Sequence, residues 1–306
     1  WPGQEGGEAT AALLLGEETP SGKLPVSFPA SEEESMARNA EHQERYGNVG
    51  GDLADHSSYS YFTEGINNGY RTYISNNNEN VTYEFGYGLS YTEFEYGEFT
   101  VFSTATESPV IAMVSVTNTG KQDSAEIVQL YASNPDSTYG DYAPKKRLVA
   151  FEKVSLAAGE TKTVTLTVSP EDMTLWNSNT DSYEIEAGTY TFEIGSSSQD
   201  IKGTAQLPIA GSDFNGLDIS TPVSVYDKSF ASSHLTYNEY SKAHTAQNLK
   251  DDVLVGGYST VMSRTEGSWT ALNGVQLDGI TRLTASVAYA CEEKHVSDNH
   301  DTGDND

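Results

Sequence analysis

Cysteine is almost absent from this chain. Cys291 is the single cysteine among 306 residues, which excludes an internal disulfide framework and a zinc site built from several thiolates. Long apolar runs are missing too: no stretch of 18 apolar residues occurs, so no membrane-spanning helix is predicted. The Asp-x-Asp-x-Asp-Gly spacing of an EF-hand is also absent. We therefore expect no metal site and no cofactor in this chain.

Positive charge is scarce as well. Lys and Arg number 17 against 45 Asp and Glu, which gives a formal net charge of −28. This balance argues against nucleic acids and anionic membranes as partners. It favours a highly soluble protein, and together with the lack of cysteine it predicts a secreted, extracellular or periplasmic location. The chain starts without Met and without a signal peptide, so we expect a piece of a longer protein.

The first thirty residues predict a small, incomplete unit. Residues 1–7 form a glycine-rich turn, residues 8–15 have the pattern of a short helix that ends at Gly16, and residues 24–29 are an extended segment bracketed by prolines. One helix and one strand cannot bury their own apolar side chains, and each large one left exposed forfeits about 2 kcal/mol. We expect these residues to pack on a domain that lies outside the sequence.

An aromatic and glycine-rich stretch at residues 83–96 separates two differently patterned regions. Its glycines, Gly86 and Gly88, permit close backbone approach and positive φ. Large aromatic side chains flank them: Phe85, Tyr87 and Tyr91. We interpret these five residues as a structural hinge held between two packed bodies.

Beyond the hinge the pattern predicts a β-sandwich. Val110, Ala112, Val114 and Val116 alternate with polar or small residues, which is typical of a half-buried strand. Further strand patterns recur at roughly ten-residue spacing to about residue 208, at 124–133, 147–154, 164–168, 183–185 and 190–194. About seven short strands at this spacing predict an immunoglobulin-like or fibronectin type III-like fold.

The motifs of this region resemble those of glycoside hydrolase family 3. The N-terminal motifs are WPGQEGG at residues 1–7, PSGKLPVSFP at 20–29, EGINNGYRTY at 64–73 and FGYGLSYTEF at 85–94. The sandwich motifs are VTNTG at 116–120, VQLY at 128–131, LVAFEKV at 148–154, AGET at 158–161 and EAGTYTFEIGSSS at 186–198. The resemblance implies the end of an α/β-sandwich domain followed by a fibronectin type III-like domain.

The same resemblance locates the catalytic groups outside this chain. Retaining glycosidases need two carboxyl groups about 5 Å apart, and the family implies an Asp nucleophile on a barrel domain and a Glu acid/base in the α/β domain. Both would lie upstream of residue 1, so the barrel domain is an expected partner that is missing here. The acidic residues near the start are Glu5, Glu8, Glu17, Glu18 and Glu64. Surface solvation and helix-start charge account for them, and we assign no catalytic residue.

The last hundred residues resemble the first half of a family 6 carbohydrate-binding module. Residues 253–258 read VLVGGY and residues 267–269 read GSW, before a Thr- and Ala-rich strand pattern at 281–288. Ser268 stands where that module has Asp, and the downstream ligand-binding half has no counterpart. An aromatic face can stack on the C–H face of a sugar, so Tyr258 and Trp269 are candidate sugar-binding residues, with core packing as the alternative.

The resulting fold class is mainly β. We expect a remnant of the α/β domain with a long connecting loop at 1–91, a fibronectin type III-like domain at 92–208 and a linker at 209–236. A partial, jelly-roll-like carbohydrate-binding region follows at 237–291, and a disordered acidic tail at 292–306.

Two functions remain open from the sequence. The first is the accessory C-terminal part of a secreted family 3 enzyme that hydrolyses terminal β-glucosidic or related bonds in β-linked oligosaccharides or polysaccharides, inactive without its upstream domains. The second is a non-catalytic carbohydrate-binding or cell-surface sandwich protein. Affinity electrophoresis on β-glucans and xylan, with Tyr258→Ala as control, discriminates between the two, and this chain alone should show no turnover of aryl β-glucosides.

Overall fold

The computed structural model divides the chain into two compact units, Trp1–Phe214 and Asn215–Asp306, and each is described by itself. In the first unit the structure describes residues 3–36, 64–75, 77, 80–103, 108–140, 143–177, 180–212 and 214. In the second it describes residues 217, 219–220, 222–223, 229–231, 235–240, 258–263, 270–272, 275 and 277–285.

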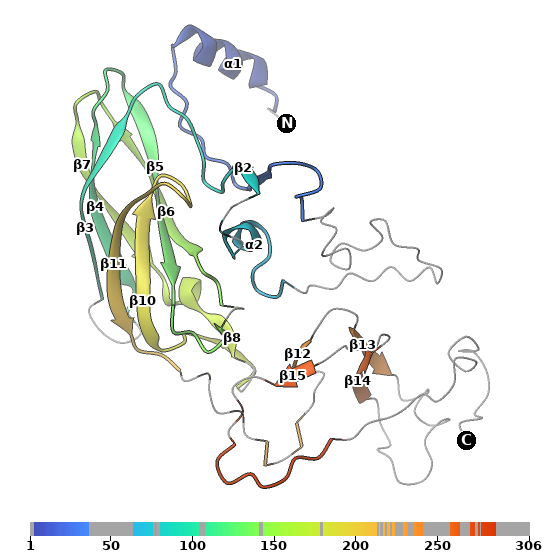
Figure 1. Cartoon of the computed structure of the whole chain (residues 1–306). Coiled ribbons are helices and arrows are strands. Elements are labelled where there is room, and N and C mark those ends of the chain that lie inside the picture. Colours follow the sequence, from blue (N-terminus) through green and yellow to red (C-terminus); the bar gives the residue numbers. More distant parts are fainter. Residues whose placement is uncertain are drawn as a thin grey trace. The chain divides into compact units, whose positions relative to one another are not determined.

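The first unit contains an antiparallel β-sandwich (Figure 1). One sheet has the strand order β3-β4-β7 and the other the order β11-β10-β5-β6. The strands are β3 Phe94–Ser103, β4 Val110–Asn118, β5 Ser124–Ser133, β6 Arg147–Leu156, β7 Thr161–Val168, β10 Gly188–Gly195 and β11 Ile201–Ile209. This arrangement confirms the predicted mainly-β, fibronectin type III-like fold.

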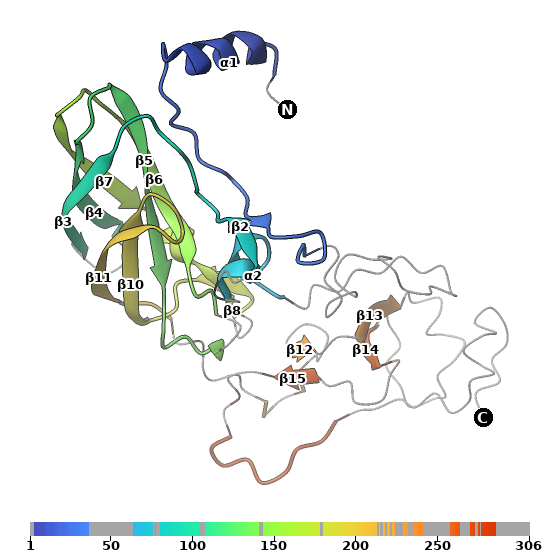
Figure 2. The ribbon, with the colours of Figure 1, turned by 45° about the horizontal axis from the view of Figure 1, so that its top comes forward.

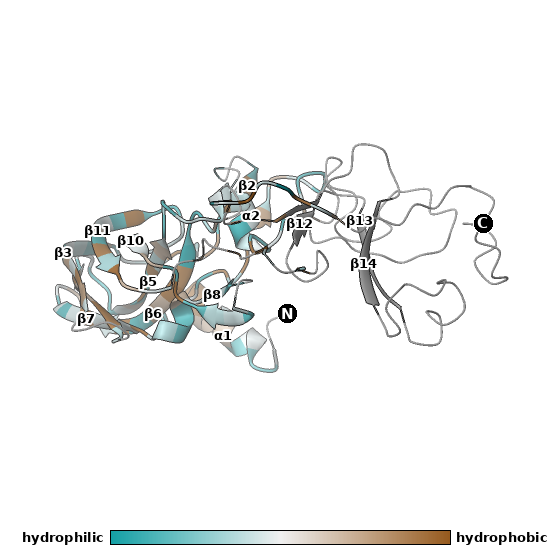
Figure 3. Cartoon of the chain, turned by 90° about the horizontal axis from the view of Figure 1, so that it is seen from below, coloured by the Kyte–Doolittle hydropathy of each residue, from teal (hydrophilic) through white to brown (hydrophobic). Residues whose placement is uncertain are grey.

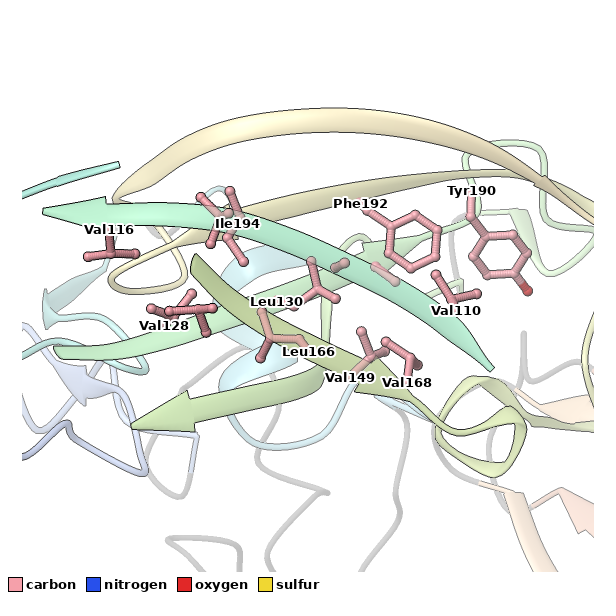
Figure 4. Close-up of a cluster of buried hydrophobic side chains, with 14 of the residues drawn as sticks. Val110, Val116, Val128, Leu130, Val149, Leu166, Val168, Tyr190, Phe192 and Ile194 are labelled. Atoms are coloured by element: carbon pink, nitrogen blue, oxygen red, sulfur yellow. The ribbon is translucent and has the colours of Figure 1, made fainter. Parts of the chain in front are cut away.

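The alternating patterns build the core between the two sheets. Every second residue of β4 from Val110 to Val116 is buried, and Val110 and Phe192 project into the same layer as Leu130 and Leu166 (Figure 4). Polar and apolar positions alternate along the strands (Figure 3). Each large aliphatic side chain buried here contributes about 1.5–3 kcal/mol, so the core holds the sandwich together.

Short elements precede the sandwich. Helix α1, Gly6–Leu15, ends at Gly16 in the left-handed region at φ 73°, which confirms the predicted helix with a start two residues earlier. Strand β1, Phe28–Pro29, pairs with β2, Val81–Tyr83. Helix α2, Tyr70–Ser75, was not predicted, because its six residues are too few to show a helical period.

One strand pairing differs from the sequence pattern. The pattern places strands on both sides of Ala187 and Gly188, but β9, Ser182–Glu184, pairs with β8, Leu175–Asn177, after the 3-10 helix η3, Pro170–Met173. Strand β10 instead pairs with β11 and β5. The reason is a clamp on the intervening residues: the Ala187 N–H donates to the Ser212 carbonyl and the Ser212 N–H donates to the Ile185 carbonyl.

The second unit has two strand pairs. Strand β12, Ser229–Ala231, pairs with β15, Thr270–Leu272, and β13, Leu235–Tyr240, pairs with β14, Tyr258–Ser263. The strand expected at 281–288 is wrong for its described part, because residues 281–285 form no strand and are exposed. Residues 292–306, expected to be disordered, lie outside the described residues, and the domain boundaries stay a prediction. Within the described chain, no helix has the length and apolar character needed to cross a membrane.

Candidate functional site

The residues predicted as a hinge lie against the outer face of the four-stranded sheet. Strand β5 directs Val128 and Leu130 into the core and Gln129 and Tyr131 to the opposite face, yet all four side chains are buried. The outer face is therefore covered, and contacts from residues 84–88 provide part of the cover.

Gly86 packs directly on Gln129. The Gln129 Nε2 group donates to the Gly86 carbonyl at 3.1 Å and to the Ser196 carbonyl at 2.6 Å, while its Oε1 atom accepts from the Tyr131 hydroxyl at 2.5 Å. Gly86 has φ 80°, and a Cβ atom there would lie 2.0 Å from Gln129 Oε1. Glycine is therefore required at this position by both its backbone angle and its neighbour.

The neighbours of Gly86 tie the segment to two further elements. The Phe85 ring stacks on Tyr70 of α2 with 4.0 Å between centroids. The Phe85 carbonyl accepts from the Ser198 N–H at 3.0 Å, and the Ser197 hydroxyl donates to the Glu84 carboxylate at 2.5 Å. Residues 84–85 thus join α2 to the turn between β10 and β11.

The opposite edge of the segment pairs with the N-terminal region. The Gly86 N–H donates to the Leu24 carbonyl, and the Leu24 N–H donates to the Tyr87 carbonyl, both at 2.8 Å. A Cβ atom on Gly88 would lie 2.5 Å from the Gly22 carbonyl oxygen. Tyr91 donates its hydroxyl to the carbonyl of residue 13 in α1 at 3.0 Å. Residues 22–24 are therefore held beside residues 86–88.

An ion pair fastens the N-terminal region to β5. The Lys23 ammonium lies 2.9 Å from Glu126 Oε1, and the Tyr96 hydroxyl donates to the same oxygen at 3.3 Å. Burial raises the pKa of Glu126, although Lys23 opposes the shift, and burial also raises the pKa of Tyr96. We call residues 22–24 and 84–88, with the side chain of Gln129 on the outer face of β5 and the side chain of Glu126 at the core-side start of the same strand, the seam.

The sequence reasoning found the glycines and aromatics of the seam but missed its partners. Glu126 and Gln129 are polar residues inside the otherwise apolar stretch of β5, which is the signal that could have found them. A buried polar side chain needs a partner, and here the partners come from residues more than forty positions away, Gly86 and Lys23.

The structure does not test the two predicted sugar-binding residues. Tyr258 begins β14 opposite Tyr240, and only its backbone is described. Trp269 lies outside the described residues. Both therefore stay predictions.

The acidic residues near the start of the chain differ in their exposure, and we assign none of them a catalytic role. They are exposed around α1 at Glu5, Glu8, Glu17 and Glu18, whereas Glu64 is buried ahead of α2. Among the residues that the structure describes, no cluster of three or more His, Cys, Asp or Glu side chains could hold a metal ion.

Comparisons with known proteins agree with this architecture. Residues 1–91 match the glycosyl hydrolase family 3 C-terminal domain, and residues 126–198 match the fibronectin type III-like domain. Beta-glucosidase B of Emericella nidulans is 36% identical over 222 residues, covering 70% of this chain and 25% of the relative. An exo-alpha-(1->6)-L-arabinopyranosidase of Bifidobacterium longum is 35% identical, covering 68% of this chain and 26% of the relative.

Solved structures show the same similarity. DesR, a beta-glucosidase from Streptomyces venezuelae in complex with D-glucose, is 39% identical with a TM-score of 0.60, covering 68% of this chain and 25% of that protein. This chain thus spans about a quarter of the length of the relatives it matches. Its N-terminal region is similar to the glycosyl hydrolase family 3 C-terminal domain and its sandwich to the fibronectin type III-like domain, and the relatives that it matches over this region include several β-glucosidases.

Proposed function

We propose that this chain is the C-terminal, supporting part of a glycoside hydrolase that removes terminal sugars from β-glucosides or related β-glycosides. The observation that carries the proposal is the seam, which joins the region matching the family 3 C-terminal domain to the sandwich through backbone hydrogen bonds and a buried ion pair. A sandwich fixed in this way acts as a rigid support for the domain that precedes it.

In this proposal the catalytic carboxyl groups come from an upstream barrel and α/β body. A retaining mechanism places a nucleophile and an acid/base about 5 Å apart. The side chains available to contact that body are the exposed apolar ones of the N-terminal region: Leu14 and Leu15 of α1 are 80% and 73% exposed, and Val26 and Leu89 are also exposed. The five hinge residues, from Phe85 to Tyr91, then hold this contact surface against the sandwich.

The test compares this chain alone with the same chain joined to its upstream reading frame. We expect the joined protein to hydrolyse an aryl β-glucoside and this chain alone to show no turnover. An aryl α-L-arabinopyranoside should be assayed in parallel, because one relative bears that activity in its name. Hydrolysis by the pure chain alone, or an upstream frame without a barrel, would overturn the proposal.

For the second unit we propose the first half of a family 6-like carbohydrate-binding module, with Tyr258 and Trp269 as sugar-stacking residues. The support is the motif order at 253–269 and the paired strand that starts at Tyr258. Affinity electrophoresis in gels containing β-glucan or xylan tests it: Tyr258→Ala and Trp269→Ala should each reduce retardation, and unchanged migration of both would contradict it.

We also propose that the longer protein is exported. The support is the net charge of −28 and the single cysteine. Fractionation of cells that express the whole gene should recover it from the medium or the periplasm, and recovery in the cytoplasm alone would contradict export.

A further inference from the structure

An exposed aromatic pair lies on the β8–β9 hairpin. Trp176 and Tyr183 stand directly opposite each other across the two strands, with 5.2 Å between ring centroids and 75° between ring planes. Trp176 is 42% exposed and Tyr183 is 70% exposed. Figures 1 and 2 place β8 at the end of the sandwich away from α1, so this pair is separate from the apolar side chains of α1.

The edge-to-face geometry leaves ring faces available. In such a pair the edge of one ring covers one face of the other, so each ring keeps at least one face that its partner does not cover. Single exposed apolar residues are ordinary on protein surfaces. Two large rings held together on one hairpin present a broader planar apolar surface than a single residue does.

Hydrogen bonds and ring packing hold the hairpin that carries the two rings. The Trp176 carbonyl accepts a hydrogen bond from the Tyr139 hydroxyl, and the Tyr139 ring packs edge-to-face on the buried Phe214 at 5.9 Å. Asn177, which is 2% exposed, donates to Glu184 across the strands at 3.3 Å. A rigid platform binds with less ordering cost than a mobile one.

Hydrogen-bonding groups lie on the face of the hairpin opposite to the rings. Glu184 directly follows Tyr183, and its carboxylate accepts from the Ser182 hydroxyl at 2.6 Å and from Thr180. These hydrogen bonds, that of Ser182 first, lower the pKa of Glu184 to about 2, so the group is an ionised acceptor at neutral pH. Because side chains alternate along a strand, Ser182 and Glu184 lie on the face of the hairpin opposite to the two rings, so their hydrogen bonds support the hairpin and leave the ring face apolar.

We propose that Trp176 and Tyr183 form a binding platform for a neutral oligosaccharide or polysaccharide. A sugar ring matches the platform because its apolar C–H face can stack on an aromatic ring. Anionic ligands are disfavoured by the net charge of −28. The choice of a glycan rests on the proposed function, because a glycosidase acts on glycans.

The test is affinity electrophoresis of the full 306-residue chain in native gels that contain barley β-glucan, xylan or no polysaccharide. Because Tyr258 and Trp269 are separate candidates, every variant is also made with Tyr258→Ala and Trp269→Ala together. In that background we expect retardation by at least one polysaccharide, and we expect Trp176→Ala and Tyr183→Ala each to weaken binding about tenfold or more. Tyr183→Phe, which keeps the ring, should retain binding.

A matched control is Phe151→Ala, which removes an aromatic ring that is 64% exposed on β6, and it should leave retardation unchanged. Thermal unfolding identifies any variant that does not fold. If Trp176→Ala does not fold, the retardation of Trp176→Phe and Tyr183→Ala decides whether the two rings bind polysaccharide. No retardation of the chain that carries both Tyr258→Ala and Trp269→Ala, or equal retardation when Trp176→Ala is added to it, overturns the platform.

Release of the bound chain by 10 mM tetramethylammonium but not by sodium would show a cation site and would also overturn the proposal. Hydrolysis of an aryl β-glucoside by the longer protein is measured separately. Lost retardation with normal hydrolysis rejects only the platform, whereas retained retardation without hydrolysis rejects only the proposed function.

Discussion

Gly86 is the residue at which backbone conformation and packing impose the same requirement. Its φ of 80° favours glycine, and Gln129 lies where a Cβ atom would point. Gly159 offers a comparison, because it has φ 79° and no atom lies within 4 Å of the position that a Cβ atom would occupy there.

We predict that Gly86→Ala destabilises the chain by about 3 kcal/mol or more, because backbone strain of about 1–2 kcal/mol adds to displacement of the buried Gln129 amide. Gly159→Ala should cost only the strain, about 1 kcal/mol. Urea unfolding followed by tryptophan fluorescence measures both, and equal losses would show that the Gln129 contact contributes nothing.

The lowered pKa of Glu184 predicts that the stability of the chain depends on pH. Its folded-state pKa is lowered from about 4.5 to about 2, so its stabilising contribution is complete above pH 4.5 and is lost as pH falls towards 2. We expect Glu184→Gln to flatten the dependence of Tm on pH between 5 and 2. The same change at Glu98, an exposed residue of β3, controls for the loss of one surface carboxylate, and identical curves for the two variants would contradict the prediction.

At this scale the sequence revealed which residues are unusual but not what they touch. The glycines and aromatics at 85–91 are visible in the sequence, and so are Glu126 and Gln129 within β5. Their pairing depends on chain segments that only the fold brings together, so the hinge could be predicted and the seam could not.

At the scale of elements, β5 departs from the simple rule of one buried and one solvated face. Residues 84–88 lie over its outer face at Gln129, and Lys23 pairs with Glu126 at the core-side start of the strand. Alternation predicts the core face of such a strand, but it cannot reveal that another part of the chain lies over the second face.

Lys23→Met should therefore lower the free energy of unfolding of this chain. Breaking a buried ion pair leaves Glu126 uncompensated, with a loss of about 3 kcal/mol at pH 7. The folded-state pKa of Glu126 then rises further, so stability should fall as pH increases from about 4.5 towards neutrality, and adding Glu126→Gln should restore part of it.

Denaturant titrations at pH 4.5 and 7 measure these changes. Lys162→Met, which breaks an exposed pair with Glu160 at 3.1 Å, should cost less than about 1 kcal/mol. A similar small loss for Lys23→Met would show that the seam does not depend on its ion pair.

Helix α1 allows a prediction that separates the isolated chain from the longer protein. Because Leu14 and Leu15 are exposed here, their joint replacement by Glu should change the stability of this chain by less than about 0.5 kcal/mol. In the longer protein the same change should lower both Tm and hydrolysis if these residues pack on the upstream body. Leu130→Ala in the core, expected to cost about 2–5 kcal/mol in either context, is the positive control.

At the scale of the whole molecule, the sandwich was the most predictable part. Its strands are long and strongly alternating, as in β4 and β7, and their family motifs lie in order. The β8–β9 pairing was not predicted, because strands of three residues each carry too little periodic signal and their pairing depends on the clamp at Ser212.

The seam has a consequence for how the molecule opens. Its hydrogen bonds connect Leu24 with Gly86 and Glu84 with Ser197 at isolated points, whereas the strands of the sandwich are joined by continuous ladders of paired residues. The N-terminal region can therefore detach as its own cooperative unit while the sandwich stays folded. In native-state hydrogen exchange, the amides of Leu24 and Gly86 should exchange through this partial opening, and that of Leu130 only through global unfolding; equal protection of all three would show a single unit.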